Sequence, residues 1–410
     1  MQRIPAGYKQ TEIGVIPEDW NVKKLGDIGD SIIGLTYSPS EVSYFGKLVH
    51  RSSNIQNNQL SYNDNVYVNK RINEKLILKE NDILICVRNG SRDLIGKSVL
   101  IKGKSVGETF GAFMSVFRSD KFQPFIFYLI LSNLIQRQIN QSLGATINQI
   151  TNKTLNNFQI PFPPKPEEQT AIVTILSDTD ALIECLGKLI AKKKAIKQGA
   201  MQQLLTGKKR LPGFSGEWEM KKLGKIGEII TGSTPPTQIK EYWNGSIPWI
   251  TPTDISDKKD IYNSEREISP LGLQVIRKLP ANTLLVTCIA SIGKNAILRV
   301  NGACNQQINA IIPNEDADVD FLYYLIENNK QYLLGNAGIT ATLIISKKCF
   351  SEIVFSFPKN KYEQTAITTI LSDMDAEIES LEQKRDKYTM LKQGMMQQLL
   401  TGRIRIYANN

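Results

Sequence analysis

Residues Gln169–Gly207 read QTAIVTILSDTDALIECLGKLIAKKKAIKQGAMQQLLTG, and residues Gln364–Gly402 repeat them as QTAITTILSDMDAEIESLEQKRDKYTMLKQGMMQQLLTG. About two thirds of the aligned positions are identical, and the alignment needs no gap. Apolar side chains recur in both copies at the a and d spacing of a heptad, which predicts two long helices with one apolar face each. The residues expected on these faces are Ile172, Leu176, Ile183, Leu186, Ile190 and Leu204, and then Ile367, Leu371, Ile378, Leu381, Tyr388 and Leu399.

Both copies carry helix start and stop signals. Prolines precede each copy, acidic residues stand in the first turn, and each copy ends at Thr-Gly. Two matched helices far apart in the chain predict an antiparallel coiled-coil pair around a pseudo-twofold axis; a plain helical hairpin in a core is the alternative. Four basic residues interrupt the apolar faces, namely Lys193, Lys197, Arg385 and Lys392.

The repeat extends beyond the helices. Trp20–Asp30 recurs as Trp218–Glu228, and the β-rich run Asn81–Val87 recurs as Asn282–Cys288. The chain therefore divides into a globular unit, a helix, a second globular unit and a second helix. The predicted boundaries are 1–166, 167–207, 208–362 and 363–410. The fold class is mixed α/β (α+β), with two globular domains of similar fold separated by two long antiparallel helices.

Composition restricts the partners and the compartment. The formal net charge is +10 at pH 7, which favours a polyanionic partner. No apolar run is long enough to cross a bilayer, and the first residues lack the apolar core of a signal peptide. The five cysteines form no Cys-x-x-Cys pair, which is typical of reduced thiols. We expect a soluble, cytoplasmic protein with no membrane partner.

The sequence argues against an active site in this chain. His50 is its only histidine, so any catalytic triad would have to use this residue, and a metal site with several histidine ligands is excluded. The run Gly90–Ser98 resembles a phosphate-binding loop, but it has one residue too many and leads into a strand-like segment. The Asn/Asp-Pro-Pro-Tyr/Phe motif of adenine methyltransferases and the Pro-Asp motif of metal-dependent nucleases are absent. We expect no catalytic residue, no metal site and no cofactor bound by this chain.

The loops that differ between the two globular units carry binding chemistry. Arginine suits guanine O6 and N7, asparagine and glutamine suit adenine, and lysine, serine and threonine suit phosphates. The candidate DNA contacts are Thr36, Arg51, Asn54, Arg88, Asn89, Ser91, Arg92, Lys97 and Asn148, and then Thr234, Tyr242, Trp249, Thr251, Thr253, Lys294, Gln306 and Gln307. The alternative for any one of them is an ordinary solvated loop residue.

Several motifs together resemble the specificity (S) subunits of Type I restriction–modification systems, over essentially the whole length of the chain. They are Ile16-Pro-Glu-Asp-Trp20, Gln202-Gln-Leu-Leu-Thr-Gly207, Leu211-Pro-Gly-Phe-Ser-Gly-Glu-Trp218, Tyr242-Trp-Asn-Gly245 and Ile247-Pro-Trp-Ile-Thr-Pro252. The resemblance implies two target-recognition domains, each reading half of a split site in double-stranded DNA. It also implies that two methyltransferase (modification) subunits dock on the helices and that restriction/translocase subunits join them. S-adenosylmethionine, ATP and Mg²⁺ would belong to those partners.

Two other functions are compatible with the residues themselves. A stand-alone DNA-binding regulator would use the same loops but would not dock an enzyme on its helices. A coiled-coil adaptor would use the helices alone and would not bind DNA with sequence preference.

Overall fold

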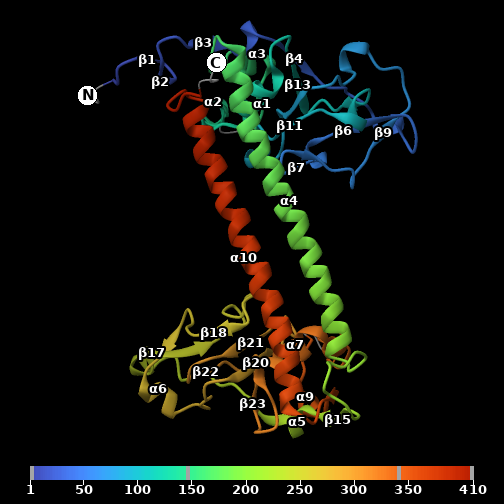
Figure 1. Cartoon of the computed structure of the whole chain (residues 1–410), viewed down its shortest axis with the longest axis vertical. Helices are drawn as coiled ribbons and strands as arrows, with labels where there is room; N and C mark the ends of the chain where they lie inside the picture. The colour runs from blue at the N-terminus through green and yellow to red at the C-terminus, as the bar shows by residue number, and fades with distance from the viewer. Residues whose placement is uncertain (1–3, 145–147, 339–342, 407–410) are drawn as a thin grey trace. The chain divides into compact units, whose positions relative to one another are not determined.

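The computed structural model describes residues 4–144, 148–338 and 343–406 of the chain, which divides into two compact units (Figure 1). The first unit comprises residues 1–186 and 384–410, and the second comprises residues 187–383. Both boundaries fall inside the two long helices, α4 (Pro166–Leu204) and α10 (Lys361–Leu399). None of the described helices is long and apolar enough to span a membrane.

Each unit is built on the same antiparallel sheet. In the first unit the strand order is β11 (Ser98–Leu100), β10 (Ile83–Cys86), β13 (Met114–Arg118) and β4 (Asp30–Ile33). In the second it is β21 (Asn295–Leu298), β20 (Thr283–Thr287), β23 (Ile308–Pro313) and β16 (Gly227–Thr231), with β18 (Asp260–Ile261) added beside β21. Every residue of β10 and β20 is buried, as continuous apolar runs predict. The internal repeat is therefore a repeat of fold.

A smaller sheet carries the part of each unit whose sequence differs from that of the other unit. In the first unit it contains β12 (Thr109–Phe110), β6 (Lys47–His50), β9 (Tyr67–Val68) and β5 (Val42–Ser43). In the second it contains β19 (Glu267–Ile268), β17 (Trp243–Ile250) and β22 (Ala303–Cys304). The parallel pairs β6–β12 and β17–β22 share one register, in which His50 faces Phe110 and Ile250 faces Cys304. His50 and Ile250 thus occupy the same place in the fold.

Short helices cover the main sheets. They are α1 (Gln123–Leu131), α2 (Asn133–Ser142) and α3 (Asn152–Asn156) in the first unit, and α7 (Val319–Asn328), α8 (Lys330–Gly335) and α9 (Lys347–Glu352) in the second. Each single helix expected near Pro124–Gln141 and Asp320–Leu334 is divided in two. The division lies at Ser132, which has extended backbone angles and donates its hydroxyl to the Leu129 carbonyl, and at Asn329.

The remaining strands form two-stranded pairs, and two short helices complete the second unit. In the first unit the hairpin β1 (Tyr8–Thr11) and β2 (Gly14–Pro17) precedes β3 (Asn21–Lys24), which pairs with β14 (Gln159–Phe162); β7 (Ile55–Gln56) pairs with β8 (Gln59–Leu60). In the second unit β15 (Glu219–Lys222) pairs with β24 (Val354–Phe357), and α5 (Leu223–Ile226) and α6 (Pro270–Gln274) complete the fold. The pairs β3–β14 and β15–β24 are counterparts.

The ends of the long helices belong to the globular cores. Ile172 and Leu176 of α4 lie in one apolar cluster with Leu399 of α10 and the first unit's sheet, and Ile367 and Leu371 lie in a second cluster with Leu204. Of the residues predicted on the apolar faces, Ile172, Leu176, Leu186, Ile190, Leu204, Ile367, Leu371, Ile378 and Leu399 are buried, while Ile183, Leu381 and Tyr388 are half-buried. Each unit therefore holds one end of both helices.

Three of the four basic residues that interrupt the heptads form ion pairs between the helices, whereas Arg385 pairs with Asp386 on its own helix. In the second unit Lys193 pairs with Glu377 at 2.6 Å and Lys197 pairs with Asp375. Within the first unit Lys392 pairs with Asp180 at 2.6 Å. As the residue number rises along α4, the number of its partner on α10 falls, so the helices run antiparallel in the second unit. These lysines extend the helix contact instead of breaking it.

Candidate nucleic-acid interface

Two predicted loops of the first unit meet beside the end of β10. Arg88 pairs with Gln149 as an isolated antiparallel bridge, and the amide of Asn89 donates to the carbonyl of Asn148 at 3.3 Å. The side chain of Asn148 in turn donates to the Gly90 carbonyl at 3.0 Å. Residues almost sixty positions apart in the chain therefore form one surface.

Arg88 is an exposed residue of this surface. Its guanidinium carbon lies 5.0 Å from the ring centroid of Phe113, which is itself 54% exposed. No ion pair in the described part of the chain involves Arg88. Arg92 is exposed as well, but one of its nitrogens donates to the Asn140 carbonyl at 2.9 Å.

Other predicted contacts of the first unit shape the loops from inside. Asn54 is fully buried: its oxygen accepts from the Arg51 amide, and its nitrogen donates to the carbonyls of Ser61 and Asp64. Arg51 pairs with Asp64 at 2.8 Å. Asn54 could contact DNA only if this loop opened, because all its polar atoms are engaged. For the rest, Asn89 donates to Ser52 and accepts from the Ser91 amide, Thr36 and Ser91 are exposed, and Lys97 is half-buried.

In the second unit the predicted residues form a connected cluster of loops. Thr234 donates to Gln306 at 2.6 Å, and both are exposed. Trp249 is only 4% exposed and donates its indole N–H to the Ser233 carbonyl at 2.9 Å, so its ring supports this cluster from below. Among the others, Gln307 accepts from Asn305, Thr251 bonds Thr253 and Asp254, Tyr242 is half-buried and Lys294 is exposed. DNA contact by all of these residues stays a prediction.

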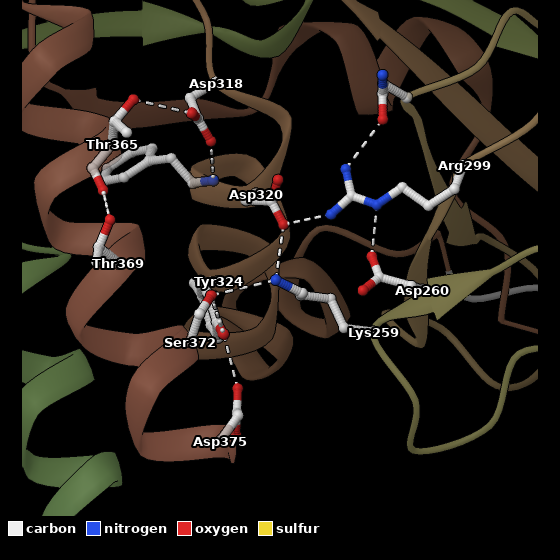
Figure 2. A network of polar contacts seen from close by, with 12 residues as sticks. Lys259, Asp260, Arg299, Asp318, Asp320, Tyr324, Thr365, Thr369, Ser372 and Asp375 are labelled. Atoms are coloured by element: carbon white, nitrogen blue, oxygen red, sulfur yellow. Dashed lines mark hydrogen bonds and ion pairs between the residues drawn. The ribbon is translucent and has the colours of Figure 1, made fainter. Parts of the chain in front are cut away.

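A polar network joins the loop after Thr253 to the helices of the second unit (Figure 2). Lys259 lies 2.7 Å from an Asp320 carboxylate oxygen and 3.2 Å from the Ser372 hydroxyl of α10. Arg299 joins Asp320 to Asp260 of β18, at 2.6 Å in each case. Burial by itself would raise the pKa of Asp320, but the bonds from Arg299 and Lys259 outweigh it and lower that pKa. The loop end is thereby fixed to α7 and α10.

A second polar contact recurs in both units. Tyr324 donates to Asp375 of α10 at 2.7 Å, as Figure 2 shows, and Tyr128 donates to Asp180 of α4 at 2.8 Å. The lysines that pair with these aspartates, Lys197 and Lys392, lie 5.3 and 5.4 Å from the ring centroids of the same tyrosines. Burial, followed by the nearby carboxylate, raises the pKa of Tyr128 far above its usual value. Each globular domain is thus fastened to its long helices by the same set of side chains.

Sequence reasoning missed Arg266, which lies against Trp243 and Trp249. Its signal is weak because the contact joins residues 17 to 23 positions apart and has no matching arginine in the first repeat. No group of three or more His, Cys, Asp or Glu side chains that could hold a metal ion occurs within residues 4–144, 148–338 and 343–406.

Comparison with known proteins finds one family. A family profile described as "Type I restriction modification DNA specificity domain" matches residues 17–194 and, a second time, residues 215–388. The putative type I restriction enzyme MjaX specificity subunit of Methanocaldococcus jannaschii is 28% identical over 422 residues, which cover 97% of each chain. The MjaIX specificity subunit of the same organism is 36% identical over 176 residues, covering 42% of this chain and 40% of the relative. The EcoR124I/EcoR124II specificity subunit of Escherichia coli is 32% identical over 261 residues, covering 60% and 62%.

Solved structures share the fold. A chain from a solved type I R-M system superposes with a TM-score of 0.60 at 17% identity, covering 95% of this chain and 99% of its own length. The S subunit of a Type-I restriction-modification system from M. genitalium gives a TM-score of 0.57 at 16% identity, covering 93% and 96%. This likeness confirms the predicted arrangement of two similar mixed α/β domains.

Proposed function

Because the chain belongs to the family of Type I restriction modification DNA specificity domains, we propose that it reads a bipartite sequence in double-stranded DNA as the specificity subunit of a Type I enzyme. The observation that carries this proposal is one scaffold with different side chains at equivalent positions. Arg88 and Ile289 follow the equivalent strands β10 and β20 and form equivalent antiparallel bridges, to Gln149 and Ile344. One scaffold with different loop residues suits the reading of two different half-sites.

The chemistry of modification and cleavage belongs, in this proposal, to partner subunits. The chain has no methyltransferase or nuclease motif. Two methyltransferase subunits would bring S-adenosylmethionine, and restriction/translocase subunits would bring ATP and Mg²⁺. This chain would contribute DNA specificity and a platform for assembly, in the cytoplasm, without a catalytic centre of its own.

The surface proposed for docking differs from the apolar faces named in the sequence. Nine of those twelve residues are buried, so they hold the fold and are not available to a partner. A separate stripe on α4 is open: Ile175, Leu182 and Leu189 are each 36% exposed, and Ile196 is 47% exposed. The four recur every seven residues and therefore lie along one side of the helix. A helix of a methyltransferase subunit could pack along this stripe.

The first test separates the proposal from its two rivals. The full chain is purified with its methyltransferase subunits and used to select duplexes from a randomised DNA library at several salt concentrations. We expect two short motifs separated by an unread spacer. The chain alone should not transfer a methyl group from S-adenosylmethionine, whereas the complex should. A regulator would select its motif but not co-purify with a methyltransferase, and an adaptor would select no motif.

The second test concerns the first unit. Replacing Arg88 by alanine should relax one base position in one half-site, at a cost of about 1–3 kcal/mol, if its guanidinium contacts a base. A phosphate contact would instead weaken all sequences alike and lower the salt slope. The double variant that also replaces Arg92 should add little, because Arg92 already donates to Asn140. Unchanged preference at both half-sites would count against this loop as a reader.

A further inference from the structure

Arg266 lies against two tryptophans of the second unit. Its guanidinium carbon lies 4.0 Å from the ring centroid of Trp243 and 5.2 Å from that of Trp249. The two indoles meet edge to face, with their centroids 5.1 Å apart and their planes at 89°. A cation at these distances is attracted to the ring faces, and the stacking limits how the planar group can turn.

Both tryptophans are fixed from behind. The indole N–H of Trp249 donates to the Ser233 carbonyl at 2.9 Å, and that of Trp243 donates to the Pro236 carbonyl at 3.3 Å. Arg266 itself is exposed, and no ion pair in the described ranges involves it. The edges of its guanidinium therefore keep their N–H donors for an acceptor from outside the chain.

The stack is specific to the second unit. The amide of Trp249 donates to the Arg266 carbonyl at 3.3 Å, and in the first unit the amide of Val49 donates to the Val66 carbonyl at 2.8 Å. Val49 of β6 pairs with Thr109 of β12, and Trp249 of β17 pairs with Ala303 of β22, in the same parallel register. Val49 and Trp249 are therefore equivalent, and Arg266 occupies the position that Val66 has in the first unit. An arginine and a tryptophan thus stand at the positions of two valines that share the same backbone hydrogen bond.

The third member of the stack lies beside a break in register. The pairing of β17 with β19 shifts between Trp243 and Ile247, so Trp243 has no first-unit residue in the same register. Trp243 lies against Arg266, whereas Phe45, on the approach to β6, is 64% exposed. The stack therefore combines two substituted positions, 249 and 266, with a tryptophan that belongs to the second unit alone.

The stack adjoins the predicted loop cluster of the second unit. Ser233, which holds Trp249, is followed by Thr234, and Thr234 donates to Gln306. Thr251 lies two residues after Trp249 on the same chain segment. Arg266 is therefore placed among the side chains expected to face DNA.

We propose that Arg266 reads a guanine in the half-site of the second unit, by donating two hydrogen bonds from its guanidinium to O6 and N7 in the major groove. This inference rests on the proposed function. A bidentate contact needs a planar fork in a fixed orientation, which the two indoles supply. A phosphate contact would not need such a fork, since the point charge of a lysine serves it as well.

The experiment uses the complex of the full chain with its methyltransferase subunits and a library of randomised duplexes. Arg266→Ala should lower the discrimination for guanine at one position of one half-site by about 5- to 150-fold. Arg266→Lys keeps the charge but lacks the fork, so it should lose the same discrimination while keeping the salt slope. Trp243→Phe keeps an aromatic ring but a smaller one, and should give an intermediate loss.

The controls separate base reading from charge and from folding. Lys240→Ala removes an exposed positive charge from the same unit and should leave the guanine preference intact. Thermal unfolding of each variant shows whether the loops still fold. Uniform weakening of all sequences by Arg266→Ala, or an unchanged motif, would overturn the proposal while leaving the proposed function in place. Failure of the wild-type complex to select any motif would overturn both.

Discussion

His50 has an environment that opposes its protonation. It is fully buried, neither ring nitrogen has a hydrogen-bond partner in the part of the chain that the structure describes, and its ring meets Tyr62 edge-on at 6.0 Å. Burial lowers the pKa of His50 to about 4. The equivalent position of the second unit holds Ile250, so the fold does not need a polar group there.

Stability should therefore depend on pH through His50. The unfolded side chain binds a proton below about pH 6.5, whereas the folded one stays neutral down to about pH 4. The free energy of unfolding therefore falls as pH drops from about 6.5 to about 4. Above about pH 6.5, His50 is neutral in both states and costs the folded state nothing. His50→Ile should reduce the loss in unfolding free energy between pH 7 and pH 5 by about 2 kcal/mol. Denaturant titrations at both pH values measure this, and parallel losses in the two proteins would contradict it.

Residue chemistry predicted which side chains lie in the loops but not which of them are accessible. Asn54 and Arg88 are equally plausible readers in the sequence, yet the first is fully buried and the second exposed. The difference arises from long-range pairing, since the bonds of Asn54 reach Ser61 and Asp64. Arg266 escaped notice for the same reason: only the pairing of the strands brings it to Trp243.

At the scale of elements, the two long helices were the most predictable feature. Their starts at Pro166 and Lys361 lie within two residues of the predicted boundaries. The sequence predicted helices separate from the globular domains, but the helix ends are part of the domain cores. Heptad spacing predicts that a helix has an apolar face, and it does not say whether that face packs on another helix or on a domain. Leu176 and Leu371, for example, are buried in the clusters of the two domains.

The glycines that end the helices provide a matched pair of tests. Gly207 and Gly402 both have φ of +69°, which costs a residue with a Cβ about 1–2 kcal/mol. A Cβ at Gly402 would lie 2.5 Å from Cγ of Pro17, whereas at Gly207 the nearest atom, on Trp218, is 3.2 Å away. Both alanine variants should therefore lose stability, and Gly402→Ala should lose more. Urea unfolding of the two variants measures the difference; a larger loss for Gly207→Ala would show that the steric contact at Pro17 relaxes.

For the whole molecule, the duplicated sequence predicted two similar units but not that the end of the chain completes the first. Arg405 donates to Glu168 at 2.6 and 3.0 Å and to Asp19 at 2.8 and 2.9 Å. Its counterpart in the second unit is Arg210, which donates to Glu363 at 2.5 and 2.8 Å. The guanidinium carbons lie 5.8 Å from the ring centroid of Trp20 and 5.9 Å from that of Trp218, respectively. Each arginine stands three residues after the glycine that ends the repeated stretch, so the gap-free repeat itself aligns Arg210 with Arg405.

Each arginine should therefore stabilise only its own unit. Glu168 and Glu363 have side chains only 5% and 2% exposed, so removing the paired cation leaves a buried carboxylate, at a cost of roughly 3–5 kcal/mol. Arg405→Ala should raise amide hydrogen exchange in β10 and β13 and leave β20 and β23 protected, while Arg210→Ala should do the reverse. Arg403→Ala, two residues away on the same tail and exposed, is the matched control and should change neither. Equal loosening of both units by Arg405→Ala would mean that the units unfold as one cooperative body, and Arg405 would then stabilise the whole molecule.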